Sequence, residues 1–424
     1  DEIMTVHKIP YGQGYLSFGF PDWILPETIK PQHVSPVGDP QQAVCTAISN
    51  PEGGMSLSDF RGAKNVAIAV NDRTRPVPNA QLLPPLVNQL ERIGVNPGAI
   101  QFIIATGTHP RVAPEDYAEI LPREILGRCQ VGCHDCEDSG TLIRLGDTTR
   151  GTPVWVNRRF VEADLRIVVG NIEPHQFQGF SGGVKGAAIG LAGRETIEKN
   201  HARMTSPKAQ SGRYLDNPAR QEVEEIGRMI DVHFALNALL NSDKQIVSVI
   251  AGDPYGVMEK GIPISRQISQ VRVRNQFDLV IASPGGYPKD INLYQSQKAL
   301  ASAAKITHRG GTVILAAECM EGTGNQTYER FMDRVSSHQE VLERFEQEGF
   351  SVGMHKAVQI AMDAIRVKVI LVSELDPSMV RKCLLTPASS IDEALGSSPV
   401  DLAGGLKVGI MPQASFTMPV IMAE

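Results

Sequence analysis

Seven short runs of apolar, mostly β-branched residues recur along the chain and predict buried strands. They are residues 65–70, 99–105, 163–170, 244–252, 277–283, 311–317 and 367–375. Each run is almost continuously apolar, as is typical of strands covered on both faces of a parallel sheet. Residues 79–94, 293–306 and 337–349 have the spacing of helices with one apolar face. This alternation predicts an α/β protein with doubly wound, mostly parallel sheets.

The chain of 424 residues is long enough for two domains, each with its own core. A helical pattern gives way to a new strand within residues 257–276, which predicts a domain boundary there. We therefore expect an N-terminal domain over residues 1–268 and a C-terminal domain over residues 269–407. The last segment, residues 408–424, is expected to return and complete the N-terminal domain.

Composition narrows the class of protein. Hydrophobic residues make up 42% and charged residues 21%, close to the average for a soluble globular protein. The formal net charge of -6 disfavours general binding of nucleic acid, which favours a basic surface. No apolar run reaches the length of a membrane span, and the first residues lack the pattern of a signal peptide. Six cysteines in a chain of this length are no disulfide framework, so we expect a cytoplasmic, reduced protein without membrane or nucleic-acid partners.

Polar residues follow four of the predicted strands at the point where each strand ends. These segments are residues 71–79, 106–110, 171–201 and 284–298. In open α/β sheets, ligands bind beyond the carboxyl ends of the strands. Because the four segments carry Asp, Arg, His, Lys and Gln side chains, they predict a ligand site that combines anion binding with acid–base chemistry.

The first two segments have a specific chemistry and a simpler alternative. Arg73, Thr74 and Arg75 follow a buried strand, and an arginine fork suits a phosphate or a carboxylate. His109 follows the next strand and could act as an acid or a base. The alternatives are a solvated turn for residues 72–76 and a structural role for His109.

Residues 181–193, SGGVKGAAIGLAG, form a glycine-rich run that matches neither a Walker A motif nor GxGxxG. Lys185 lies among apolar neighbours there, where a desolvated amine could serve as a nucleophile or a covalent tether. The alternative is a glycine-rich turn with a lysine that extends to solvent. His201 follows a helical stretch, and imidazole is a common nickel or zinc ligand.

Cys129, Cys133 and Cys136 have the C-x3-C-x2-C spacing of iron–sulfur enzymes that use S-adenosylmethionine. Such a motif usually lies near the start of a (β/α) barrel, whereas this one lies within the chain and partly inside a strand. Alternation along a strand would point the sulfurs in different directions, so structural thiols are the favoured interpretation.

Taken together, these motifs resemble those of one family. The chain resembles the nickel-pincer lactate racemases and related 2-hydroxy-acid racemases and epimerases along almost its whole length. The resemblance is carried by DRTRPVP, ATGTHP, HDCED, IEPH with GFSGGVK, the histidine at 201, AGDP and GGYPKDINLYQSQK. It departs from the family pattern at Val184 and Gly186, where the family has SGGRKS, and at Thr108, where the family has an aromatic residue.

The resemblance implies a nickel pincer nucleotide, a nickel-bearing pyridinium-3,5-bisthiocarboxylate mononucleotide. It implies that Lys185 bonds covalently to this cofactor, that His201 is the protein ligand of nickel, and that His109 and His175 are the paired acid–base residues. The cofactor and the substrate anion would be lined by Asp72, Arg73, Thr74 and Arg75. The substrate would be held from the second domain by Tyr294, Gln295 and Lys298, across a cleft between the domains.

The activity that the resemblance implies is inversion of C2 in a small, lactate-like 2-hydroxy acid. Hydride transfer, coupled to removal of the hydroxyl proton, would avoid the dianion formed by removing a proton from C2. Two histidines are needed because the hydroxyl groups of the two enantiomers point in different directions. The expected partners are this substrate and, transiently, the enzymes that make the cofactor.

Two other functions have to be weighed. An oxidoreductase of 2-hydroxy acids that uses NAD is one, but no GxGxxG follows the first predicted strand. A non-catalytic carrier of the nickel cofactor is the other, and it would need His201 and Lys185 without the pair of His109 and His175.

Overall fold

The computed structural model describes residues 4–399 and 405–422. The contacts within the chain divide it into two units, one formed by His33–Ile268 and the other by Asp1–Gln32 together with Ser269–Glu424. Within the described ranges, no helix combines the length and the apolar character needed to cross a membrane.

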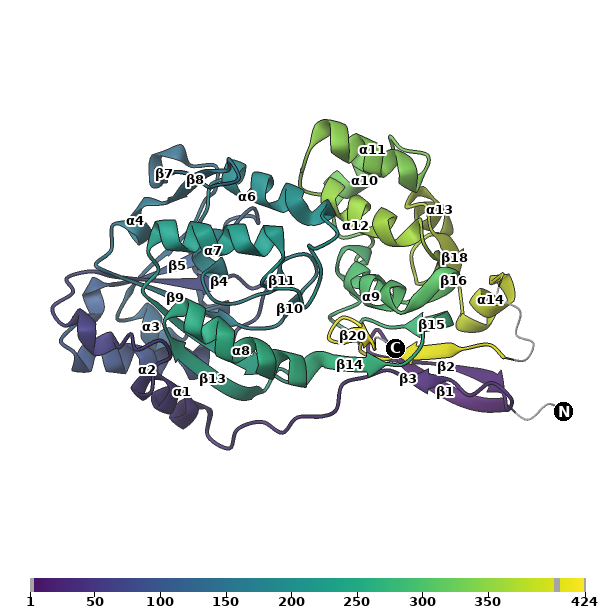
Figure 1. Cartoon of the computed structure of the whole chain (residues 1–424), viewed down its shortest axis with the longest axis horizontal. Coiled ribbons are helices and arrows are strands. Elements are labelled where there is room, and N and C mark those ends of the chain that lie inside the picture. The colour runs from purple at the N-terminus through teal and green to yellow at the C-terminus, as the bar shows by residue number, and fades with distance from the viewer. Residues whose placement is uncertain (1–3, 400–404, 423–424) are drawn as a thin grey trace. The chain divides into compact units, whose positions relative to one another are not determined.

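The His33–Ile268 unit is built on a six-stranded sheet with the strand order β13-β12-β9-β4-β5-β6 (Figure 1). The strands are β4 (Val66–Asn71), β5 (Ile100–Ala105), β6 (Gln130–Cys133), β9 (Leu165–Asn171), β12 (Phe234–Leu240) and β13 (Ile246–Gly252). Neighbouring strands are parallel, except that the edge strand β13 runs antiparallel to β12.

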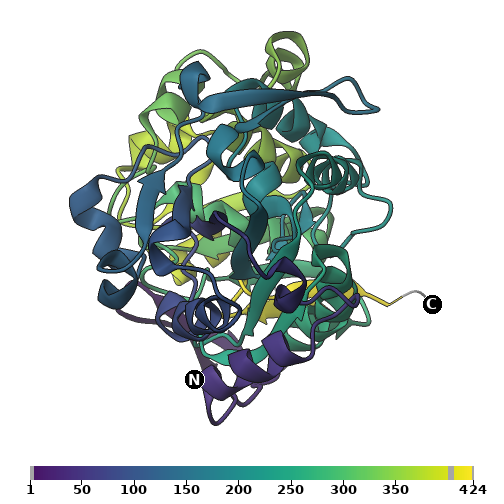
Figure 2. The same ribbon diagram turned by 90° about the vertical axis from the view of Figure 1, so that its left-hand side faces the viewer.

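Helices cover both faces of this sheet. Alternate strand residues such as Ile68, Ile167 and Leu236 belong to one apolar core with α1 (Pro40–Ser49) and α2 (Asn79–Arg92). The short helix α5 (Lys185–Ala188) contacts β4 and β9 and packs on α7 (Pro218–Ile230). Figure 1 shows α7 above the sheet and α1 and α2 below it, and the turned view in Figure 2 agrees.

Helices α5 and α7 approach closely because Gly227 faces Val184. A Cβ added at Gly227 would lie 2.5 Å from the Cβ of Val184, which is fully buried. Val184 is one of the positions that depart from the family pattern, and its side chain packs within the core on this side of the sheet.

The remaining elements of the unit connect or flank these layers. They are α3 (Arg123–Leu126), α4 (Arg158–Val161), α6 (Arg194–His201), α8 (Pro254–Ser269), the hairpin β7 (Leu142–Asp147) and β8 (Pro153–Asn157), and the short pair β10 (Pro174–His175) and β11 (Gly179–Phe180).

The second unit has a six-stranded parallel sheet with the order β18-β17-β16-β15-β19-β3. The strands are β3 (Glu27–Thr28), β15 (Phe277–Ala282), β16 (Thr307–Ala316), β17 (Lys368–Val372), β18 (Thr386–Ala388) and β19 (Val408–Met411). The helices are α9 (Leu293–Lys305), α10 (Gln326–Met332), α11 (His338–Glu348), α12 (Met354–Ala364), α13 (Pro377–Lys382) and α14 (Ile391–Ser397).

Both ends of the chain contribute to this second unit. The hairpin β1 (Met4–Tyr11) and β2 (Gly14–Pro21) packs Ile9, Phe18 and Phe20 into the same core as residues of β15. Strand β14 (Gln270–Val273) pairs with β20 (Met418–Ile421).

The predicted fold class is confirmed, since both units are α/β with mostly parallel sheets. All seven predicted strands and all three predicted helices are present with small shifts at their ends. The predicted domain assignment is wrong at both ends of the chain. Residues 4–32 and the described part of 408–424 belong with the second unit, because β19 inserts between β15 and β3 and thereby buries its apolar residues. The break between Ile268 and Ser269 falls at the expected place.

Candidate active site

Three of the four polar segments meet at one edge of the first sheet. Strands β9, β4 and β5 are neighbours and parallel, so the segments that follow them leave the sheet at the same edge. Asp72 follows β4, His109 follows β5, and His175 follows β9. The fourth segment follows β15 and belongs to the other unit.

Asp72 holds His109 at this edge. Its Oδ2 lies 2.7 Å from Nδ1 of His109, and its Oδ1 accepts hydrogen bonds from the hydroxyl and the backbone N–H of Thr74, at 2.6 and 3.0 Å. The Asp72 side chain is 5% exposed, whereas that of His109 is 42% exposed. Burial alone would raise the pKa of Asp72, but the hydrogen bond and charge of His109, with the bonds from Thr74, hold it below its ordinary value. A buried carboxylate therefore orients a ring that solutes can reach.

His175 has a different environment. Nη2 of Arg75 lies 3.3 Å from its Nε2, and the backbone N–H of Gln178 donates to its Nδ1 at 3.3 Å. Backbone amides and guanidinium groups only donate hydrogen bonds. Because a neutral imidazole accepts at one nitrogen only, just one of these two contacts can be a hydrogen bond in either tautomer, whereas the Asp72 carboxylate accepts from Nδ1 of His109.

Lys185 begins α5 after a turn in which Gly182 and Gly183 both have positive φ. The N–H of Gly183 donates to Oδ1 of Asn237 on β12 at 2.8 Å, which anchors the turn to the sheet. Lys185 is 9% exposed. Burial, and then the charges of Arg75 and Arg220, hold the pKa of Lys185 well below its ordinary value, against the opposite effect of Glu173. A lowered pKa favours the neutral amine, which is the nucleophilic form of lysine.

His201 is the last residue of α6. Its Nδ1 lies 3.3 Å from Oδ1 of Asn200. The ring of Phe177 lies between His201 and His175, with centroid distances of 5.0 and 5.1 Å and nearly perpendicular planes. One aromatic ring therefore contacts both the predicted metal ligand and one predicted acid–base residue.

Other predicted site residues lie in different surroundings. Arg73 is 63% exposed and faces Glu119 at 3.5 Å, so it does not share the contacts of Arg75. In the second unit, Tyr294, Gln295 and Lys298 lie in the first two turns of α9. The hydroxyl of Tyr294 lies 3.1 Å from Nε2 of His355, and Nζ of Lys298 donates to Oε1 of Gln295 at 3.0 Å.

The three cysteines of the C-x3-C-x2-C spacing are free thiols. Within the described ranges, no group of three or more His, Cys, Asp or Glu side chains is placed to hold a metal ion. Burial raises the pKa of all three thiols. His134, between two of them, is fully buried and contacts Ala192 O at 2.9 Å, which is a structural role.

The edge of the sheet also offers a buried acceptor to a ligand. Nδ2 of Asn171 donates to the backbone O of Pro76 at 2.9 Å, while its buried Oδ1 has no hydrogen bond. Leaving a buried acceptor unsatisfied costs about 1–3 kcal/mol, so a ligand hydroxyl or N–H there would be stabilising. The amine of Lys185, the imidazole of His201 and this acceptor are the kinds of group that a nucleotide-like cofactor carrying a metal would need.

A polar network below His201 was not predicted from the sequence. It consists of Gln178, Asn200, Arg203 and Glu222. Asn200 precedes His201 and Gln178 lies in the same motif-rich segment, so proximity along the chain was a usable signal for these two. Nothing in the sequence of α7 marks Glu222.

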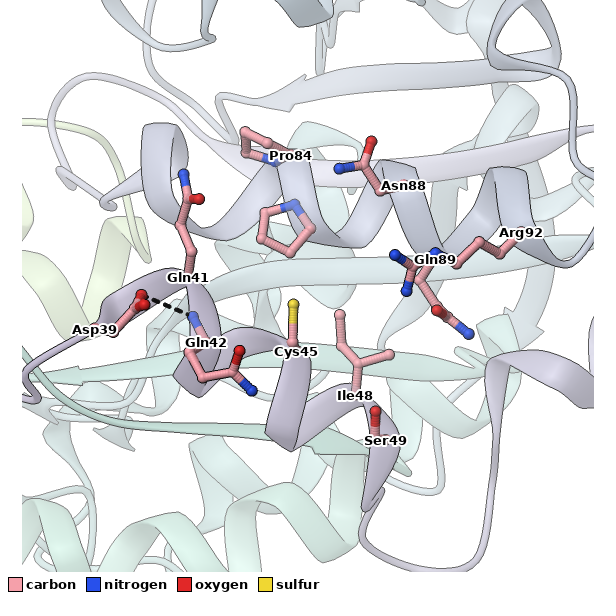
Figure 3. Close-up of a pocket in the computed structure, with 11 residues that line it drawn as sticks. Asp39, Gln41, Gln42, Cys45, Ile48, Ser49, Pro84, Asn88, Gln89 and Arg92 are labelled. Atoms are coloured by element: carbon pink, nitrogen blue, oxygen red, sulfur yellow. Dashed lines mark hydrogen bonds between the residues drawn. The ribbon is translucent and has the colours of Figure 1, made fainter.

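A separate surface pocket of about 270 Å³ lies between α1 and α2 (Figure 3). Its lining includes Asp39, Cys45, Asn88 and Arg92, and Asp39 caps α1 by accepting from the N–H of Gln42. None of the predicted site residues lines it, and its helices cover the face of the sheet opposite α5.

Comparison with known proteins gives consistent results over the whole chain. Residues 11–212 match the lactate racemase N-terminal domain, and residues 273–414 match the lactate racemase C-terminal domain. The chain is 30% identical over 414 residues to a lactate racemase from Thermoanaerobacterium thermosaccharolyticum, covering 96% of this chain and 97% of that protein. It is 29% identical over 383 residues to a lactate racemase from Lactiplantibacillus plantarum, covering 88% and 89%.

Solved structures agree. The structure of the lactate racemase apoprotein from Thermoanaerobacterium thermosaccharolyticum matches with a TM-score of 0.90 and 29% identity, covering 98% of this chain and 100% of that one. A crystal structure of a Thermotoga maritima protein matches with a TM-score of 0.66 over 91% of this chain and 99% of its own. At 18% identity, the second similarity concerns the fold alone.

Proposed function

Because this chain belongs to the lactate racemase family and is therefore an isomerase, we propose that it inverts C2 of a small, lactate-like 2-hydroxy acid with a nickel pincer nucleotide. The observation that carries this proposal is the pair of histidines at one edge of the sheet, His109 bonded to the Asp72 carboxylate and His175 next to the Arg75 guanidinium. Two such rings can serve the two enantiomers of one substrate.

The environments of the two rings suggest how they share the work. His175 accepts the hydroxyl proton of one enantiomer, and His109, oriented by the hydrogen bond to Asp72, returns a proton to the oxygen of the other. The roles exchange in the reverse reaction. Bound nickel pincer nucleotide supplies an acceptor for hydride from C2, which avoids removing a weakly acidic proton next to a carboxylate.

The substrate carboxylate has to stay in place while the reacting carbon rotates to present its other face. Arg75 is suited to this because its planar fork can bind a carboxylate with two hydrogen bonds, and it already lies beside His175. We assign the remaining substrate contacts to Tyr294, Gln295 and Lys298 of the second unit. Asp72 and Thr74 act through His109, whereas the exposed position of Arg73 suits a peripheral contact with the cofactor.

Lys185 and His201 are the residues we assign to the cofactor. The depressed pKa of Lys185 favours the neutral amine that a covalent bond to a thiocarboxylate requires. His201 provides one imidazole donor for nickel, and Asn171 at the end of β9 offers a hydrogen-bond acceptor. The cytoplasmic location and the transient partnership with cofactor-making enzymes remain predictions.

The two alternative functions account for less of the site. An NAD-dependent oxidoreductase would not need Lys185 or His201, and a cofactor carrier would not need the bond between Asp72 and His109. Membership of a racemase family agrees with neither.

The test is to produce the chain together with the enzymes that make the cofactor and to supply single enantiomers of small 2-hydroxy acids. Chiral chromatography should show conversion of at least one acid to a racemic mixture or an epimer, and the His109→Ala variant made in the same way should show none. Loss of the hydroxy acid to the 2-oxo acid with added NAD, without inversion, would instead support the oxidoreductase.

A further inference from the structure

The side-chain amide of Asn200 has a fixed orientation. Its Nδ2 donates to the backbone O of Ala219 at 2.9 Å and to Oε2 of Glu222 at 3.0 Å. A carbonyl and a carboxylate only accept hydrogen bonds. The amide nitrogen must therefore face these two groups, and Oδ1 must face the opposite side.

That opposite side contains His201. Oδ1 of Asn200 lies 3.3 Å from Nδ1 of His201 and accepts from Nε2 of Gln178 at 2.7 Å. Because an amide oxygen cannot donate, the contact with His201 is a hydrogen bond only when Nδ1 carries the proton. The neutral ring then has its lone pair on Nε2, the atom that can bind a metal.

Glu222 anchors this arrangement from below. It is fully buried on α7. Besides Asn200 it accepts hydrogen bonds from Thr148, Thr152 and Arg203, at distances of 2.7 to 2.9 Å. Burial would raise the pKa of Glu222, but these four donors hold it below its ordinary value, so the carboxylate stays ionised and keeps the Asn200 amide in place.

Gln178 connects the same group to the other histidine. It is fully buried, and its Oε1 has no hydrogen bond. Burying an unsatisfied carbonyl costs stability, and an apolar residue would avoid that cost. Gln178 donates a side-chain N–H to Oδ1 of Asn200 and its backbone N–H to Nδ1 of His175. It therefore links the segment that carries His175 to the residue that contacts His201.

We propose that Asn200 is a positioning residue that fixes His201 with the proton on Nδ1 and Nε2 directed to the metal, and that Glu222 and Gln178 hold its amide in the required orientation. The statement that Nε2 serves nickel rests on the proposed function. The statement that Asn200 selects the tautomer of His201 rests on the hydrogen bonds alone. Outer partners of metal-binding histidines typically contribute about 10–100-fold to metal affinity.

The tautomer can be measured in the full-length chain made without the cofactor. Long-range proton–nitrogen NMR spectra of protein labelled in its ten histidines distinguish the two neutral tautomers, and His201→Gln assigns the signal. Wild type is expected to show His201 protonated on Nδ1. Asn200→Ala is expected to give a mixture or the opposite tautomer. An unchanged tautomer in Asn200→Ala would overturn the proposal.

Asn157→Ala is the matched control. Nδ2 of Asn157 also lies 3.3 Å from a histidine, Nδ1 of His134, and Asn157 is likewise buried in the same unit. The Asn157→Ala variant should disturb the NMR signal of His134 and leave that of His201 unchanged.

If Asn200→Ala does not fold, the Asn200→Asp variant tests the proposal instead. It has the same shape and keeps an oxygen acceptor for Nδ1 of His201, so His201 should keep its proton on Nδ1. Loss of that tautomer in Asn200→Asp would count against the proposal.

Nickel content of the chain produced with the cofactor-making enzymes gives the second measurement. Asn200→Ala should bind nickel about 10–100-fold more weakly than wild type, and Asn157→Ala should equal wild type. Equal nickel affinity in Asn200→Ala and wild type would overturn the metal-positioning role while leaving the racemase proposal intact. Absence of nickel from wild type would instead refute the proposed cofactor, and the NMR experiment would still decide whether Asn200 sets the tautomer.

Discussion

Asp72 and His109 are joined by a hydrogen bond of 2.7 Å between Oδ2 and Nδ1, with the carboxylate buried and the imidazole ring partly exposed to solvent. They lie 37 residues apart in the chain and meet because β4 and β5 are parallel neighbours. A buried carboxylate behind an accessible imidazole selects one tautomer of the ring and fixes its orientation. This relationship is the basis of the first prediction.

Asp72→Asn should lower the rate of racemisation by about 10²–10⁴-fold, because the amide can no longer hold His109 with its proton on Nδ1. Nickel content should stay at the level of wild type, since the Asp72 carboxylate is engaged by Thr74 and His109, which are not the residues assigned to the metal. Chiral chromatography and metal analysis of the same preparation check both statements. Asp147→Asn, on the surface hairpin of β7 and β8, is the control and should keep full activity. Unchanged turnover in Asp72→Asn would remove the pair from the mechanism.

Alanine variants of the three site histidines should fall into two classes, one that loses activity and one that loses nickel. His109→Ala and His175→Ala should each lose about 10²–10⁴-fold in racemisation while keeping nickel, and His201→Ala should lose nickel. Metal analysis should find about one nickel per chain in wild type and no iron–sulfur cluster. Cys129→Ala should leave the nickel content unchanged. Stoichiometric iron with little nickel would contradict this assignment.

Arg75→Met should raise KM and lower kcat together, because the contact that binds the carboxylate also positions the reacting carbon. Lys298→Met should do the same if the second unit contributes to the substrate site as proposed. Steady-state kinetics with both enantiomers measure the two constants. Arg144→Met, which removes an arginine from a surface ion pair with Asp147, is the control. A change in KM alone would show that Arg75 binds the substrate without orienting it.

Lys185→Met should increase the free energy of unfolding of the chain made without the cofactor, because Met removes the cost of burying an amine. The sign follows from the pKa of Lys185, which is lowered in the folded state. At pH values between the lowered pKa of Lys185 in the folded chain and its ordinary pKa of 10.5, the unfolded chain binds more protons than the folded chain. The free energy of unfolding of wild type therefore rises with pH in this range. The advantage of Lys185→Met should therefore shrink toward pH 10.5. Denaturant titrations at several pH values test this, and an advantage that is constant with pH would show that Lys185 is not desolvated.

Deuterium at C2 of the substrate should slow turnover and should be recovered largely at C2 of the opposite enantiomer. Both results follow if the hydrogen leaves and returns as hydride without exchange with water. Mass spectrometry of the product measures the retained label. Washout of the label at every turnover would mean proton abstraction at carbon, and the proposed mechanism would then be wrong even for an active racemase.

The apolar runs of the sequence determined most of the secondary structure, because strands buried on both faces need continuous apolar residues whatever their neighbours are. One central strand was missed. β12 has the sequence FALNALL, and its Asn237, which anchors the turn before Lys185, interrupts the apolar run. The polar segments after the strands also predicted that Asp72, His109 and His175 lie at one edge of the sheet, because parallel strands place their carboxyl ends on one edge.

Only the tertiary structure decided which of these residues act together. Arg73 and Arg75 are two positions apart, yet one faces solvent and Glu119 while the other lies beside His175. Glu222 is 22 residues from Asn200 and supports it only because α7 packs next to α6. The C-terminal strand β19 joins the second sheet because β15 and β3 together offer two strand edges to it. Hydrogen-bond partners and strand neighbours of this kind depend on burial and on long-range pairing, which no local pattern along the chain encodes.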